Sequence, residues 1–313
     1  MGLAGVGGGR DGGSRSRQAA VDSEREPGSR PGDSPIGILD RARQSAKLLL
    51  NLRLRPPPRT LEEQVYASAV REGDACLDIG ANVGWIALFL ARTAGPEGHV
   101  IAFEPVWPTY RRMCRNIQAT INVRAPIYPV PMGVADADRV ATVHVPRGRP
   151  EAASIAMAAD DETVPVDRYE CRFVTLDGFL SARGEPPGDF WKIDVEGAEL
   201  MVVRGASGLF ADGHRPMIAA EVFAPWQRRC GYEPWDLLGP MLDLGYQFLF
   251  LCPGGLVEHR PRSDQPFPAG FEDGYNLLAY VPGRHDDRLR ALGPLRAGTG
   301  RALRVGRAPR PNQ

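Results

Sequence analysis

The sequence predicts an α/β fold, a doubly wound Rossmann-like sheet that is mostly parallel and has an antiparallel last strand. Short apolar runs alternate with helix-length segments over residues 75–251, and this alternation is typical of βαβ units. Two of the runs end in carboxylates close to a glycine, at Asp78 and at Asp194, as strands do at the sheet edge that binds ligands. Residues 253–274, before the final run, are Pro, Gly and charged residues, so no crossover helix is expected and the last strand returns antiparallel.

The expected elements follow one another over residues 60–282. A first helix over 60–72 opens with Thr60 and has Glu63 three residues later, which is the pattern of a capping box. The expected strands then cover residues 75–79, 99–103, 126–134, 140–145, 190–193, 217–222, 246–251 and 275–281. The expected helices cover residues 83–92, 107–120, 176–182, 198–206 and 234–244.

Both ends of the chain differ in composition from this central domain. Residues 1–35 are rich in Gly, Ser, Arg and Pro, and residues 283–313 carry eight arginines against two aspartates. Neither segment can bury enough apolar surface to offset the entropy lost on ordering, so we expect both to be disordered. Residues 36–59 combine helical spacing with three consecutive prolines, which predicts a helical appendage and a Pro-rich linker before a domain over 60–282.

Composition argues against several classes of protein. The 38 basic residues balance the 38 acidic ones, so no overall field favours nucleic acid, and we interpret the Arg-rich tail as a solvated segment. The five cysteines lack the spacing of a zinc site or a disulfide framework. No apolar run is long enough for a transmembrane helix, and no signal peptide is visible. We expect a cytoplasmic protein, whose oligomeric state this composition does not specify.

The turn over residues 78–84 has the features of a nucleoside site. Gly80 and Gly84 flank a strand-to-helix turn, where the missing Cβ lets the backbone approach a ligand, and Asn82 lies between them. The turn lacks the Gly-x-Gly-x-x-Gly spacing of dinucleotide sites. The carboxylate of Asp78 would repel a pyrophosphate, but it suits the ammonium and sulfonium charges of S-adenosylmethionine. We therefore expect this turn, Asp78 included, to bind S-adenosylmethionine.

Two further acids are candidate ligands of the nucleoside. Glu104 ends the second strand, 24 residues after Gly80, where an acid hydrogen-bonds a ribose diol. The alternative is a glutamate that caps the helix starting near Pro105. Asp136 follows the third strand and is expected near the adenine edge, with a capping role in its turn as the alternative.

Carboxylates near two neighbouring strand ends are the candidate catalytic groups. Asp194 and Glu196 follow the strand over 190–193, and Lys192 lies within it. Lys192 and Asp194 share a face, because strand residues two apart point the same way, and an interior lysine needs a paired carboxylate. We expect all three residues to act on the acceptor.

Two other acids lie close by in this prediction. Glu221 ends the strand over 217–222, which should lie beside Asp194. Together they could hold Mg²⁺, but two carboxylates are few for this ion, and a metal is not expected. Glu199 lies in the first turn of the next helix and is expected to cap it.

The run Lys-Ile-Asp-Val-Glu-Gly-Ala-Glu over 192–199, together with residues 77–84 and the Phe-Glu-Pro at 103–105, resembles the FkbM family of S-adenosylmethionine-dependent methyltransferases. The resemblance extends over residues 60–282 and implies the methyltransferase form of the doubly wound sheet. It also implies O-methylation of a small-molecule or glycan acceptor, such as a sugar, a glycolipid or a secondary metabolite. Two alternatives stay open: an NAD-linked oxidoreductase on a similar sheet, and a non-catalytic nucleoside-binding module.

Overall fold

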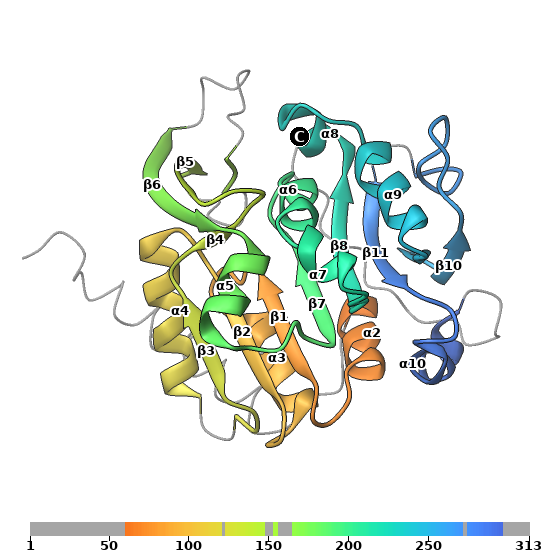
Figure 1. Cartoon of the computed structure of the whole chain (residues 1–313), viewed down its shortest axis with the longest axis horizontal. Helices are drawn as coiled ribbons and strands as arrows, with labels where there is room; N and C mark the ends of the chain where they lie inside the picture. The colour runs from red at the N-terminus through yellow and green to blue at the C-terminus, as the bar shows by residue number, and fades with distance from the viewer. Residues whose placement is uncertain (1–59, 121–122, 148–152, 156–164, 272–273, 297–313) are drawn as a thin grey trace, which may run out of the picture. The chain divides into compact units, whose positions relative to one another are not determined.

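The structure is a computed structural model that describes residues 60–120, 123–147, 153–155, 165–271 and 274–296. Its main sheet has eight strands in the order β10-β9-β11-β8-β7-β1-β2-β3 (Figure 1). The bounds of these strands are β1 Ala75–Ile79, β2 His99–Phe103, β3 Ile127–Val130, β7 Phe190–Ile193, β8 Met217–Phe223, β9 Gln247–Cys252, β10 Gly255–His259 and β11 Gly274–Tyr280.

The strand directions confirm the predicted sheet. The strands from β3 to β8 in the sheet order are all parallel, and β11 is antiparallel to both β8 and β9. β10 differs from the prediction, which placed no strand between β9 and β11. It forms because the chain reverses through Pro253 and Gly254, so that Cys252 pairs with Gly255 in an antiparallel hairpin.

Helices cover both faces of the main sheet, because successive strand residues point to opposite sides. On one face Cys76 and Phe190 pack in a core with the helices α2 (Leu61–Ala69), α3 (Trp85–Ala94) and α4 (Trp107–Ala119). On the other face Leu77 and Trp191 pack with α5 (Leu176–Arg183), α6 (Glu199–Arg204), α7 (Ser207–Ala211), α8 (Ala224–Arg229) and α9 (Pro234–Asp243). The sheet is therefore doubly wound, and its polar strand ends lie at its edges.

The first described helix begins where the sequence predicts. The Thr60 hydroxyl oxygen accepts the Glu63 N–H at 3.0 Å, and the Glu63 carboxylate accepts the Thr60 N–H at 3.4 Å. This capping box confirms the predicted start of α2. Across the described part of the chain, no helix is both long and apolar enough to cross a membrane.

A second sheet has three strands in the order β4-β6-β5 and differs from the prediction. Its strands are β4 (Gly133–Val134), β5 (Arg139–Pro146) and β6 (Val166–Val174). The strand predicted over 126–134 is divided between the two sheets around Pro131, which has no N–H to donate to a ladder. β6, for which no strand was expected, pairs antiparallel with β5 along the whole of β5.

The C-terminal segment also differs from the prediction of disorder over 283–313. Residues 286–292 form helix α10 (Asp286–Leu292), and the 3-10 turn η2 (Gly293–Leu295) follows. Two anchors hold them: Arg288 pairs with both carboxylate oxygens of Asp74, and Leu292 is fully buried. The Arg-rich composition of this segment predicts neither anchor, because each depends on residues that are distant in the sequence. The predictions for 1–35, 36–59 and the rest of the tail lie outside the described residues.

Candidate active site

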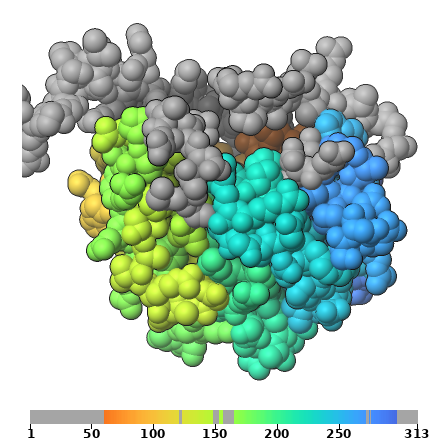
Figure 2. Space-filling view, turned by 90° about the horizontal axis from the view of Figure 1, so that it is seen from above, coloured from red at the N-terminus to blue at the C-terminus, as the bar shows by residue number. Residues whose placement is uncertain are grey.

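A cavity of about 250 Å³ lies at the carboxyl edge of the parallel strands. Residues at the ends of β1, β2, β7 and β8 contribute to it, and the second sheet forms part of its wall. Figure 2 shows the yellow-green and green surface of residues 123–147 and 165–174 beside the turquoise surface of residues 217–244. The predicted site residues that line the cavity are Gly80, Asn82, Glu104, Lys192, Asp194, Glu196 and Glu221.

The turn after β1 brings two strand ends into close approach. Gly80 has a φ of +84°, and a Cβ on it would lie 1.9 Å from the carbonyl oxygen of Asp194, so only glycine fits. Asn82 also has a positive φ, 49°, which asparagine tolerates better than most residues. Gly84 has a φ of 86° at the N-cap of α3. It shapes the turn without being among the described residues that line the cavity.

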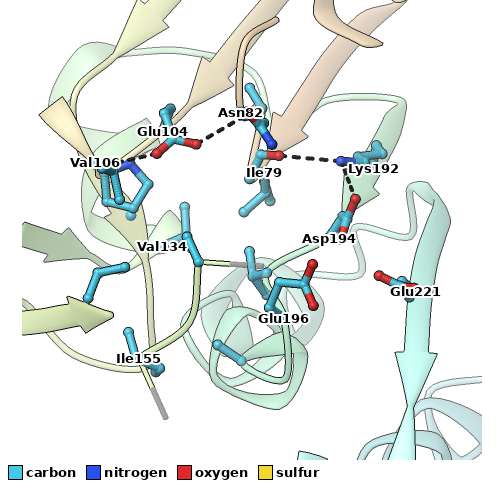
Figure 3. Close-up of a pocket in the computed structure, with 18 of the residues that line it drawn as sticks. Ile79, Asn82, Glu104, Val106, Val134, Ile155, Lys192, Asp194, Glu196 and Glu221 are labelled. Atoms are coloured by element: carbon cyan, nitrogen blue, oxygen red, sulfur yellow. Dashed lines mark hydrogen bonds and ion pairs between the residues drawn. The ribbon is translucent and has the colours of Figure 1, made fainter. Parts of the chain in front are cut away.

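Glu104 is fixed at the end of β2 by two backbone donors. The Asn82 N–H donates to Oε2 at 3.0 Å, and the Val106 N–H donates to Oε1 at 2.8 Å (Figure 3). Burial raises the pKa of Glu104 to about 7, although both N–H groups act in the opposite direction. The carboxylate thus caps the chain entering α4, as the alternative interpretation holds. It also faces the cavity, where each oxygen has a second lone pair for a ligand.

Lys192 is a buried cation between two carboxylates. Its Nζ lies 3.0 Å from Asp194 Oδ2 and 3.7 Å from Asp78 Oδ1, and it donates to the Gly80 carbonyl oxygen at 3.4 Å. Burial raises the pKa of Asp78 to about 6 against the attraction of Lys192. At Asp194 burial acts in the same direction, but the Lys192 charge and hydrogen bond prevail and lower the pKa. The expected pairing of the interior lysine is confirmed, and it keeps Asp194 ionised.

Three carboxylates gather at the end of the cavity away from Glu104. Oxygens of Asp194, Glu196 and Glu221 lie within 4.8 Å of one another, and Figure 3 shows these side chains around a common space. Burial, followed by the charges of Asp194 and Glu196, raises the pKa of Glu221 to about 9. The cluster therefore holds a proton at neutral pH, because three adjacent negative charges would repel one another.

The loop that carries Glu196 is held in an uncommon conformation. Glu196 has a φ of 50°, a region that non-glycine residues seldom adopt unless the surroundings enforce it. Its carbonyl oxygen accepts a hydrogen bond from the Ser154 hydroxyl at 2.8 Å. At the adjacent Gly197, a Cβ would lie 2.6 Å from the Trp226 carbonyl oxygen. The backbone on both sides thus fixes where the Glu196 carboxylate points.

Glu199 has a structural role, as the sequence predicts. It is 3% exposed, and its Oε1 accepts the Gly197 N–H at 2.9 Å. The hydroxyl of Tyr232 donates to Oε2 at 3.0 Å. These contacts satisfy the carboxylate next to the start of α6 and leave it outside the described cavity lining.

Two predicted nucleoside ligands are not in the cavity wall. Asp78 is fully buried next to Lys192, so it acts on the site through that lysine. Asp136 forms an ion pair with Arg139 at 2.9 Å, and it is absent from the described residues that line the cavity. Asp136 thus pairs with the first residue of β5, which is neither of the two roles expected for it, and its adenine role stays a prediction.

The sequence did not reveal the apolar wall of the cavity. Val134, Val143 and Phe173, one from each strand of the second sheet, all line it. A Cβ on Gly133 would lie 2.2 Å from the Phe173 ring, so the ring packs directly on this backbone. A signal was available in β6, where Tyr169, Cys171 and Phe173 alternate with charged residues.

Known proteins resemble this chain to different extents. The family model described as the methyltransferase FkbM domain matches residues 78–248, which is more than half of the chain and includes the runs over 192–199 and 103–105 and all but the first residue of 77–84. The AMB antimetabolite synthetase AmbE of Pseudomonas aeruginosa is 29% identical over 162 residues, which cover 41% of this chain and 7% of that protein. The chain thus corresponds to a small part of this curated relative.

Solved structures show more distant likenesses. An O-methyltransferase from Bacillus cereus in complex with SAH has a TM-score of 0.37 and 14% identity, over 76% of this chain and 89% of that one. Fibrillarin from Aeropyrum pernix, with bound S-adenosyl-L-methionine, has a TM-score of 0.37 and 15% identity, over 70% and 76%. TM-scores and identities this low do not allow the activity of one protein to be assigned to another. The family match rests instead on the sequence itself, and by that match this chain belongs to the FkbM methyltransferase family.

Proposed function

We propose that this chain transfers a methyl group from S-adenosylmethionine to a hydroxyl of a small-molecule or glycan acceptor, such as a sugar, a glycolipid or a secondary metabolite. The observation that carries this proposal is one cavity with two different carboxylates. Glu104 is held by backbone N–H groups and suits a ribose diol, whereas Asp194 is held ionised by Lys192 and suits an acceptor hydroxyl. When bound, S-adenosylmethionine would supply an electrophilic methyl carbon on a sulfonium, and breaking that carbon–sulfur bond would leave S-adenosylhomocysteine as a neutral thioether.

The residues after β1 and β2 fit this cofactor. Glu104 has lone pairs for the ribose hydroxyls, and the Gly80–Asn82 backbone lines the same cavity. The apolar wall that contains Val134 and Phe173 suits a purine ring. Asp78 and Asp194 together outweigh the single charge of Lys192, which favours a sulfonium and disfavours a pyrophosphate. These features support S-adenosylmethionine over NAD, and no observation favours the oxidoreductase.

In this proposal Asp194 orients the acceptor hydroxyl and takes its proton. Because Lys192 keeps the carboxylate ionised, it accepts a hydrogen bond from the hydroxyl. It also stabilises the positive charge that the acceptor oxygen gains as it attacks the methyl carbon. An alcohol holds its proton far above neutral pH, so the proton moves to Asp194 late, as the new carbon–oxygen bond forms. Glu196 and the protonated Glu221 complete the acceptor side of the cavity.

We propose that no divalent metal is required. The spacing of Asp194, Glu196 and Glu221 would admit a cation. The Lys192 ammonium, however, already lies 3.0 Å from Asp194, and the high pKa of Glu221 keeps a proton within the cluster. A metal ion would have to displace that proton and compete with the lysine, and both requirements weaken its binding.

Binding and turnover measurements on the full chain test this function together. Calorimetry should show that S-adenosylmethionine and S-adenosylhomocysteine bind and that NAD does not. In thermal unfolding, S-adenosylhomocysteine at a hundred times its Kd should add about 2.7 kcal/mol of stability. Turnover is followed with a labelled methyl group and a panel of sugars, glycolipids and phenolic metabolites. Binding of NAD alone would overturn the cofactor assignment, and label recovered only on nitrogen or carbon would overturn the O-methylation.

A further inference from the structure

A second cavity, of about 190 Å³, lies at the opposite edge of the main sheet from the active site. Asp189 precedes β7 and Pro216 precedes β8, so both mark the amino edge of the parallel strands. β11 runs antiparallel to β8 and delivers Arg284 and α10 to this same edge. Figure 1 shows α10 at the lower edge and α8, which follows the carboxyl end of β8, at the upper edge.

Four guanidinium groups line this amino-edge cavity: Arg71, Arg215, Arg284 and Arg288. The carboxylate of Asp74 neutralises Arg288, and Arg71 lies 3.9 Å from the exposed Asp287. Arg215 and Arg284 have no carboxylate within 4.0 Å among the described residues. Asp189 also contributes a carboxylate to the described lining, but it accepts the Ala75 N–H at 3.0 Å and forms no ion pair with Arg215 or Arg284, so these two guanidinium groups stay without a paired carboxylate.

Backbone carbonyl oxygens orient the side chains of Arg215 and Arg284. Each guanidinium has other N–H groups that these carbonyls do not use. Arg284 donates to the Gly213 carbonyl at 3.0 Å. The Nε and Nη1 groups of Arg215 donate to the carbonyls of Leu244, Phe210 and His214 at 2.6–2.9 Å. For Arg215 Nη2, the described part of the chain supplies no acceptor. The side chain is thus fixed while two of its N–H groups are left for another partner.

We propose that the amino-edge cavity binds the phosphoryl group of a small phosphorylated metabolite. A phosphoryl oxyanion carries about two negative charges, which match the two guanidinium groups that lack a carboxylate, and guanidinium forks bind such oxygens in pairs. A cavity of about 190 Å³ has room for a group the size of a phosphate or diphosphate. A nucleic acid or a membrane would need an extended charged face instead of a cavity.

Calorimetry of the full chain with sodium pyrophosphate, at constant ionic strength, tests this site. Arg284→Gln and the double variant Arg71→Gln/Arg284→Gln remove charge at exposed positions, so neither change should prevent folding. The matched control is Arg290→Gln, because that arginine lies on α10, six residues after Arg284, is 73% exposed and is not among the described residues that line the cavity. Pyrophosphate should bind the wild type and the control equally and the double variant at least about tenfold more weakly, as expected on losing charge-assisted hydrogen bonds.

Two further titrations test which anion the chain binds and whether it binds outside the active site. Sodium sulfate at the same ionic strength should bind more weakly than pyrophosphate, and saturating S-adenosylhomocysteine should leave pyrophosphate affinity unchanged. The proposal is overturned if the wild type binds no pyrophosphate, or if the double variant and the control bind it alike. It is equally overturned if sulfate matches pyrophosphate, or if S-adenosylhomocysteine displaces the anion.

Discussion

Glu104 and Asp194 both follow strands at the carboxyl edge of one sheet, and both face one cavity, yet their surroundings give them opposite properties. Glu104 is 6% exposed and is held by two backbone N–H groups. The Asp194 side chain is 37% exposed and is held by the Lys192 ammonium. Burial raises the pKa of Glu104 to about 7, whereas Lys192 overcomes burial and lowers the pKa of Asp194.

This difference separates a binding carboxylate from a reacting one. A carboxylate fixed by backbone donors keeps its position whatever its charge, which suits the recognition of a diol. A carboxylate paired with a buried ammonium keeps its charge, which suits a group that meets a developing cation. Position at the sheet edge is shared by both residues, so the partner, and not the strand end, decides the role.

The largest effect is expected from removing the charge of Asp194. We predict that Asp194→Asn lowers turnover about 10²–10⁴-fold, the usual contribution of a positioned acid or base. Single-turnover kinetics with a saturating acceptor measure the loss, and Asp212→Asn, at an exposed position, is the control. Substantial activity of Asp194→Asn on the true acceptor would remove the reacting role.

The second prediction removes the partner that distinguishes Asp194 from Glu104. Lys192→Met leaves two carboxylates, Asp78 and Asp194, without their buried cation, and should cost about 3–5 kcal/mol of unfolding free energy. Urea denaturation at neutral pH measures this cost. Because protonation relieves the repulsion, the variant should regain part of the loss at pH 5. A stability equal to that of the wild type would mean that the ion pairs are not formed.

The third prediction concerns the proton held by Glu221. The unfolded chain releases it near pH 4.5, whereas the folded chain keeps it until about pH 9. Stability from this group is therefore complete below pH 4.5 and is lost as pH rises through 9, by up to about 1.4 kcal/mol per unit. Denaturation at pH 5, 7 and 9 should show a smaller decline for Glu221→Gln than for the wild type. Glu97→Gln, at an exposed position, should decline like the wild type; equal slopes for all three would refute the raised pKa.

The smallest effect is expected from metal removal. If Lys192 and the retained proton balance the acidic cluster, EDTA treatment followed by gel filtration should leave turnover unchanged. Activity lost on treatment and restored by Mg²⁺ would show that Asp194, Glu196 and Glu221 hold a cation after all.

The sequence predicted the parts of this molecule that depend on local patterns. Glycines in a strand-to-helix turn and carboxylates at strand ends identified Gly80, Glu104 and Asp194, and the structure brings all three to one cavity. The spacing of Lys192 and Asp194 predicted their ion pair, because residues two apart in a strand share a face.

The rest depends on pairs of residues distant in the chain. Helix α10 is held by Arg288 against Asp74, 214 residues away, and no composition rule identifies such a partner. The second sheet places Phe173 in the cavity only because β6 pairs with both β4 and β5. Asp136 was assigned by its distance from a strand end, but its local pair with Arg139 holds it outside the lining.

Calorimetric titration of S-adenosylhomocysteine into Glu104→Ala and Asp194→Asn tests the division of roles most directly. Loss of the Glu104 hydrogen bonds to the ribose should weaken binding by about 1.5–3 kcal/mol, whereas Asp194→Asn, which faces the acceptor, should bind almost as the wild type does. Circular dichroism confirms that both variants are folded. Unchanged affinity in Glu104→Ala, or an equal loss in both variants, would contradict the account.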